Sequence, residues 1–182
     1  IDLGTSNITL LSGSVGGSGT TSATHTAVDT VILADHAVGQ ETDKFASESS
    51  VTGEEFFAFR LTNNASSTVT VSQVVFQLSS VTGIVQGDFA NLAIYVDADN
   101  SGTIDAGETT TVGGSGTVDA GVTTITFSMG FTISVSATVN YILKADVSNL
   151  LGGDTVTIDL GTSNITLLSG SVGGSGTTSA TH

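Results

Sequence analysis

Apolar and polar positions alternate with a period of two along most of the chain, which predicts many short β-strands. In residues 54–61, for example, Phe57, Phe59 and Leu61 fall on one face of an extended chain and Phe56 falls on the other. Strands are predicted in this way at residues 28–34, 54–61, 67–78, 92–96, 122–127, 131–135, 138–147 and 154–160, and at both copies of the sequence NITLL, residues 7–11 and 164–168.

The alternation changes phase once inside the longest predicted strand, residues 67–78. Apolar side chains stand at every second position up to Val71 and then resume at Val74. One extra residue in a strand produces such a shift, so the sequence predicts a β-bulge near Ser72 or Gln73.

Clusters of Gly, Ser, Asn and Asp separate the predicted strands at short intervals, and a helical turn fits only at residues 34–49 and 82–90. Many short strands with this punctuation are typical of β-sandwiches and β-barrels. The sequence therefore predicts an all-β, Ig-like, two-sheet β-sandwich.

A perfect internal repeat sets the domain organisation. Residues 1–25 and residues 158–182 are identical letter for letter, so the offset is 158 − 1 = 157 residues. We expect residues 26–182 to form one full repeat with its terminal strand and linker, and residues 1–25 to be the end of the preceding one. The alternative is an artificial duplication of an end segment.

Within the repeated segment, residues 12–23 are rich in Gly and Ser and are predicted to be a flexible linker between repeats. The Thr and Val residues around this stretch also allow it to pair as an extended strand.

The strongly negative net charge of the chain indicates which classes of partner it can bind. The chain has a formal net charge of −14, with three Lys and Arg residues against 17 Asp and Glu residues. This balance argues against binding to nucleic acid or to an anionic membrane and favours divalent cations. There is no Cys, so no disulfide stabilises the fold, and no apolar run reaches the length of a bilayer span.

One motif carries recognisable chemistry. Residues 97–108 read DADNSGTIDAGE and place oxygen-bearing residues at the positions of a twelve-residue calcium loop, with Gly102 at position six. Calcium needs six to eight oxygens, and a glycine at the turn lets alternate side chains converge on the ion. The predicted Ca²⁺ ligands are Asp97, Asp99, Ser101, Thr103 through its carbonyl, Asp105 and Glu108. The alternative is an acidic turn without a metal.

The flanks of this loop are predicted to be β rather than helical, so we expect it on a β-hairpin. The segment IYVDADNSGTIDAGETT resembles calcium loops in β-sandwich modules of bacterial surface adhesins of the serine-aspartate-repeat kind. The segments ILADHAVGQETDKF, FRLTNN and NYILKADVSNL are more loosely similar to a module repeated in large secreted bacterial proteins. The resemblance implies a surface or extracellular scaffold whose loop residues bind Ca²⁺.

A second acidic cluster is less specific. Asp29, Asp35, His36, Glu41 and Asp43 lie close together in sequence and offer metal ligands, but a solvated acidic loop explains them better than a second metal site does. No serine stands in a G-x-S-x-G context and no Gly-rich phosphate loop is present, so we predict that the chain is not an enzyme. Sequons for N-glycosylation occur at Asn7, Asn64 and Asn164.

Together these features predict a structural protein, an extracellular or cell-surface filament of identical tandem repeats stiffened by Ca²⁺. Its expected partners are neighbouring copies of itself, head to tail, and other surface or matrix components. The alternative is an adhesin stalk or a carbohydrate-binding repeat module. Because an uncovered sheet edge invites strand addition, we further expect at least one NITLL copy, at 7–11 or 164–168, to pair with an adjacent repeat. The alternative is that both copies pair within their own sandwich and the Gly/Ser stretch is a loose tether.

Overall fold

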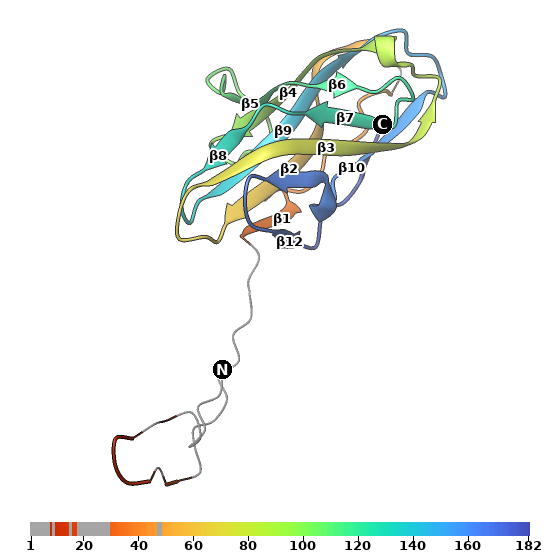
Figure 1. Ribbon diagram of the computed structural model, residues 1–182. Helices are drawn as coiled ribbons and strands as arrows, with labels where there is room; N and C mark the ends of the chain where they lie inside the picture. The colour runs from red at the N-terminus through yellow and green to blue at the C-terminus, as the bar shows by residue number, and fades with distance from the viewer. Residues whose placement is uncertain (1–7, 9, 15, 18–29, 47–48) are drawn as a thin grey trace.

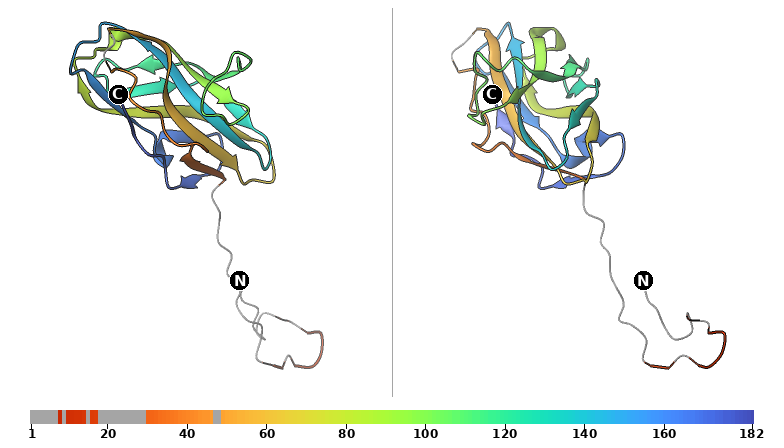
Figure 2. Two further views of the ribbon diagram at one scale, coloured as in Figure 1. Left: turned by 180° about the vertical axis from the view of Figure 1, so that it is seen from behind. Right: turned by 90° about the vertical axis from the view of Figure 1, so that its left-hand side faces the viewer.

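The computed structural model describes residues 8, 10–14, 16–17, 30–46 and 49–182. From residue 30 onward the described chain forms two β-sheets that pack face to face, as Figure 1 and the two views of Figure 2 show. The predicted all-β, two-sheet sandwich is therefore confirmed.

The first sheet has six strands in the order β12-β1-β2-β9-β4-β5. Its central strands β2 and β9 are long and antiparallel, and β12 joins the edge of β1 in parallel. Its strands are β1 (Val31–Asp35), β2 (Val51–Asn63), β4 (Phe89–Asp97), β5 (Thr111–Ser115), β9 (Thr138–Val147) and β12 (Val172–Gly174).

The second sheet is built around one long strand, β3 (Val69–Thr82). On one side of β3 lie β10 and β11, and on its other side lie β7 and β8. The remaining strands of this sheet are β6 (Thr117–Val118), β7 (Thr124–Phe127), β8 (Phe131–Ile133), β10 (Thr155–Asp159), β11 (Ile165–Leu167) and β13 (Ala180–Thr181).

The predicted bulge lies at Ser72. Thr166 of β11 pairs with Gln73 and the next residue, Leu167, pairs with Val71, so Ser72 is the extra residue in β3. Its hydroxyl donates to the carbonyl of Thr166 at 3.0 Å. The phase shift in the sequence is thereby explained, because each half of β3 keeps its apolar side chains in the core.

Aromatic rings from the two sheets meet in the middle of the core. Phe57 and Phe59 of β2 contact Phe76 of β3 edge to face, with ring centroids 5.5 and 5.7 Å apart. Phe59 also stacks on Tyr141 of β9 at 5.2 Å. These rings are fully or almost fully buried, so inward-facing aromatic residues of β2, β3 and β9 hold the two layers together.

Helical structure is confined to short turns. The 3₁₀ turn η2 (Gln86–Asp88) lies in residues 82–90, one of the two stretches where the sequence allows a helical turn. A second turn, η3 (Thr162–Asn164), precedes β11 and lies outside both stretches, so the restriction of helical turns to them is wrong. In the other stretch, residues 34–46 and 49 contain strand and irregular chain without a helix.

The Gly/Ser stretch of the second repeat copy differs from the flexible linker favoured by its composition. Val172–Gly174 forms β12 on the edge of β1, and Ala180–Thr181 forms β13 on β10. Long-range backbone hydrogen bonds, which composition does not reveal, order this stretch. The extended-strand alternative therefore describes this copy. In the first copy, residues 7, 9, 15 and 18–23 lie outside the described residues, and Ile8, Leu10 and Leu11, which are described, are not in a strand.

The three cationic side chains all lie in the folded part of the chain. Arg60 on β2 and Lys144 on β9 belong to the two central strands of the first sheet. Lys144 is 3.7 Å from Glu55, and Lys44, in the connection before β2, is 3.2 Å from Glu41.

Candidate metal site

The loop with the predicted calcium-binding motif, residues 97–108, connects two antiparallel strands, as the sequence predicts. Strand β4 ends at Asp97 and β5 begins at Thr111, and the two strands pair through Ile94 and Val112. The loop between them is therefore carried by a β-hairpin.

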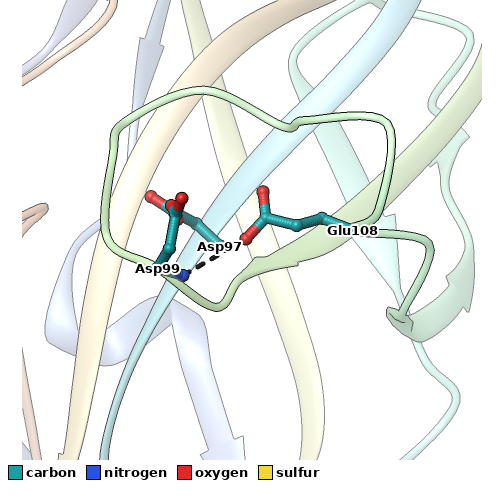
Figure 3. A group of neighbouring side chains, drawn as sticks. All are labelled: Asp97, Asp99 and Glu108. Carbon is teal, nitrogen blue, oxygen red and sulfur yellow. Dashed lines mark hydrogen bonds between the residues drawn. The ribbon is translucent and has the colours of Figure 1, made fainter.

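Three carboxylates of this loop converge. Figure 3 shows Asp97 and Asp99 side by side with Glu108 opposite them, and one oxygen of each lies within 4.8 Å of the others. Oxygens bound to one Ca²⁺ at about 2.3–2.6 Å are at most roughly 5 Å apart, so this spacing fits a single calcium ion. Among the described residues this is the one such cluster of acidic or histidine ligands.

Backbone amides support the carboxylates. The amides of Ser101 and Gly102 donate to Asp97 at 3.2 and 2.9 Å, and the Ser101 amide also donates to Asp99 at 3.0 Å. Hydrogen bonds from Ser101 lower the pKa of Asp99 below its ordinary value, because they stabilise the ionised carboxylate.

Glu108 closes the loop from its far end. One of its oxygens accepts from the amides of Ala98 at 2.5 Å and Asp99 at 3.3 Å, and the other accepts from the amide of Asp105 at 3.1 Å. Both ends of the loop therefore meet at this one carboxylate, the position that supplies two oxygens to the ion in a twelve-residue calcium loop.

Of the remaining predicted ligands, Ser101 and Thr103 lie close together and Asp105 lies apart from the converging carboxylates. The hydroxyl of Ser101 donates to the carbonyl of Thr103 at 3.1 Å, so both oxygens lie on the same side of the loop. Asp105 is exposed and its carboxylate is not part of the converging group. Position nine of such a loop often reaches the ion through water, which is compatible with this placement.

The turn of the loop requires glycine. Gly102 has φ +84°, and a Cβ atom there would lie 2.2 Å from the Cγ2 atom of Val38. A left-handed residue at the sixth position lets the chain reverse while the loop rests against the connection that follows β1.

A histidine that the motif does not contain lies behind the loop. The Nε2 atom of His36 is 2.8 Å from Oδ2 of Asp97, and both side chains are fully buried. The amide of Val38 donates to Nδ1 of the same ring at 3.3 Å, which places the ring proton on Nε2, facing the carboxylate. His36 thus fixes the orientation of Asp97, as residues behind metal ligands commonly do.

Two further contacts attach the loop to the first sheet. The amide of Ile104 donates to Glu55 of β2 at 2.6 Å, and Asn140 of β9 donates to the side chain of Asn100. The loop therefore lies against the sandwich instead of extending into solvent.

The other acidic cluster is dispersed over separate contacts. Asp35 accepts two hydrogen bonds from Thr178, Glu41 pairs with Lys44, and Asp43 accepts from the amide of Phe45. Asp29 lies outside the described residues.

Of the three sequons, Asn64 is exposed after β2. Asn164 is half-buried, with its side-chain oxygen accepting from the amide of Gly161 at 3.2 Å. Asn7 lies outside the described residues.

Comparison with known proteins gives no match: no family model, curated protein or solved structure matches the chain. None of the helices in the described part of the chain is long and apolar enough to span a bilayer.

Proposed function

We propose that this chain is a structural repeat of an extracellular fibre or surface filament, stiffened by Ca²⁺ at the loop between β4 and β5. The observation that carries the proposal is the repeated segment: residues 158–182 supply β11, β12 and β13 to the sandwich of residues 30–182. A sandwich that ends with a segment found again 157 residues earlier (158 − 1) is suited to propagation as a tandem array.

The proposed role of Ca²⁺ follows from where the loop is attached. Asp97 contacts His36 beyond the end of β1, Ile104 contacts β2 and Asn100 contacts β9. An ion bound by Asp97, Asp99 and Glu108 would close the loop onto these strands and reduce its freedom to open. It would also neutralise part of a chain that carries a formal net charge of −14.

Surface chemistry supports a scaffold over a carbohydrate-binding module. Tyr141 is 2% exposed, and Tyr95 is half-buried with the Lys144 ammonium 5.7 Å from its ring. The chain contains no Trp, and none of the exposed large apolar side chains in the described residues is aromatic. Carbohydrate binding generally relies on exposed aromatic faces, so these features favour the structural proposal.

Thermal unfolding in calcium and in chelator tests the role of the ion. At a concentration of 100 times its Kd, Ca²⁺ stabilises the folded state by about 2.7 kcal/mol. For a domain of this size, that raises Tm by roughly 5–11 °C. Glu108→Gln should abolish this increase, whereas Glu54→Gln, which removes the same charge from β2, should retain it. Equal Tm values in calcium and chelator would contradict the calcium site.

The fibre itself is tested by negative-stain microscopy of the secreted native material. Unbranched filaments with one density per repeat would support the structural function. Dispersed single particles would contradict it.

A further inference from the structure

The chain enters and leaves the sandwich at opposite ends of its longest strand, β3. At the start of β1, the carbonyl of Thr30 accepts from the amide of Asn64, in the turn that leads into β3. His182 exchanges two backbone hydrogen bonds of 2.9 Å with Val156 of β10, whose first residue pairs with the last residue of β3. A strand of 14 residues spans roughly 45 Å. Figure 2 shows the C-terminus and the start of β1 toward opposite ends of the long axis.

Loops between neighbouring strands form these two ends of the sandwich. The entry end, beside Thr30, consists of residues 64–68, 134–137 and 168–171, and the exit end, beside His182, consists of residues 83–88 and 148–154. Six large apolar side chains are exposed in the described residues from 30 onward, and four of them lie on these ends. Val135 and Leu168 lie on the entry end, and Val85 and Leu151 lie on the exit end. Both ends therefore present apolar surface that a contact between them would bury.

The two ends differ in charge. The three loops of the entry end contain no charged residue, whereas the exit end carries Asp88 and Asp154. In a chain with a formal net charge of −14, most surfaces of two copies repel each other. The entry end is therefore a surface that can approach the acidic exit end without placing like charges in contact.

A cavity of about 510 Å³ lies at the exit end, where the chain leaves the sandwich. Phe45, Leu151, Asp154 and His182 are among the residues that line it. His182 itself is firmly held, since it is 3% exposed and its ring lies against the rings of Phe45 and Phe56. A fixed point of the chain thus stands directly beside a hollow and an exposed leucine.

The sequence limits how far one sandwich can lie from the next. In the proposed array, the terminal segment of each repeat, residues 158–182 or their copy at 1–25, leads into the next repeat. The twin of His182 is His25, and only the four residues 26–29 separate it from Thr30. At 3.3–3.6 Å per residue, the five steps from His25 to Thr30 cover at most about 18 Å. Part of this length is needed to pass the loop before β10, because β13 is antiparallel to β10 and runs toward that loop. The exit end of one repeat and the entry end of the next are therefore held close together.

We propose that consecutive repeats dock end to end, with the entry end of one repeat packed against the exit end of the repeat before it. Val135 and Leu168 of the following repeat cover Leu151 and Val85 of the preceding one. The contact is heterologous, so it recurs at every junction and extends the filament along the direction of β3. The inference rests on the proposed tandem array and names the contact that stiffens it between repeats.

The covalent junction makes so small a contact sufficient. Interfaces that join separate proteins bury about 1,200–2,000 Å², and four apolar side chains bury only a fraction of this area. A short linker instead holds the two ends at an effective concentration in the millimolar range, at which a weak contact persists. Docking therefore belongs to consecutive repeats of one chain rather than to separate chains.

A lengthened chain, in which His182 is followed by a second copy of residues 26–182, tests the docking with a control in the same molecule. Leu151→Asp in the first copy places a charge at the junction, whereas Leu151→Asp in the second copy places it on an exit end that no repeat follows. Leu151 is 76% exposed within its own repeat, so the substitution alone should change stability little. Calorimetry should show Tm lowered by roughly 2–4 °C for the first-copy variant and almost unchanged for the second-copy variant. Equal Tm values for the two variants would overturn the docking.

Spin labels measure the docking directly. Met129 is 69% exposed, and its amide donates to Gly113, away from both ends. Because the chain has no Cys, Met129→Cys in both copies introduces two labelling sites and no others. Docked repeats should give a narrow distribution of label-to-label distances in double electron–electron resonance, and Leu151→Asp in the first copy should widen it. A broad distribution in the chain without Leu151→Asp would overturn the docking. The proposed function would survive that result, since loosely tethered sandwiches would still form filaments and melt at a higher temperature in calcium.

Discussion

The substitution Ile165→Ala measures how much the terminal segment stabilises the sandwich. Ile165 begins β11, pairs with Val74 of β3 and belongs to the buried core. Removing three carbons from a buried site costs about 2.4 kcal/mol in transfer free energy, at roughly 0.8 kcal/mol each, and the cavity adds more. Because β11 is short and Ile165 keeps 5% exposure, we expect a total loss of about 2–3 kcal/mol.

The chain contains its own control for this measurement. Ile8→Ala makes the same chemical change at a side chain that is 42% exposed, where substitutions usually alter stability by less than about 0.5 kcal/mol. At micromolar concentration, calorimetry or far-UV circular dichroism should show Tm lowered by roughly 4–12 °C for Ile165→Ala and almost unchanged for Ile8→Ala. Equal shifts in the two variants would refute the assignment of residues 158–182, rather than 1–25, to the strands β11, β12 and β13.

Three further predictions concern the loop and the titrating groups. Gly102→Ala should cost about 1–2 kcal/mol, because φ is +84°, and should weaken Ca²⁺ binding in calorimetry; unchanged affinity would contradict the proposed turn. Hydrogen bonds, above all from the Thr124 amide, lower the pKa of Asp119 to about 2. Its stabilisation is therefore present above pH 4 and lost as pH falls through 2, so the Tm deficit of Asp119→Asn should shrink over that range; a constant deficit would refute this. Burial lowers the pKa of His182, against the carbonyl of Phe56 and the charge of Asp43, which raise it, so stability should fall as pH drops below 6.5. His182→Gln should flatten that decline in a pH series of melting curves and its twin His25→Gln should not; equal pH profiles in both would contradict it.

The sequence predicts those parts of the fold that side-chain alternation encodes. Strand β9 begins and ends where the pattern in residues 138–147 does, and the shift between Val71 and Val74 locates the bulge at Ser72. The short strands β12 and β13 leave no such pattern, because they are only three and two residues long and their partners are more than 20 residues away.

In the candidate metal site, too, the sequence predicts what is encoded locally and misses what depends on distant contacts. Spacing within twelve residues identifies the three carboxylates that converge, since position in the loop dictates which side chains face inward. It does not identify His36, which lies 97 − 36 = 61 residues before Asp97 in the chain and meets it only through the packing of the first sheet. Spacing also predicts Asp105 as a ligand, but it is the backbone amide of Asp105, rather than its carboxylate, that contacts Glu108.

The positions of the three cationic residues determine where and when proteases that cleave after Lys or Arg can cut the chain. Arg60 and Lys144 lie within the paired central strands β2 and β9, so cleavage there requires the sandwich to unfold. Lys44 is different, because its amide donates to Nδ1 of His182 at 3.2 Å. The peptide bond after Lys44 therefore becomes accessible to a protease when the end of the terminal segment, residues 158–182, detaches from the sandwich. Limited digestion therefore distinguishes two kinds of opening by fragment size alone, with a first cut after Lys44 reporting release of the segment and cuts after Arg60 and Lys144 reporting loss of the whole fold.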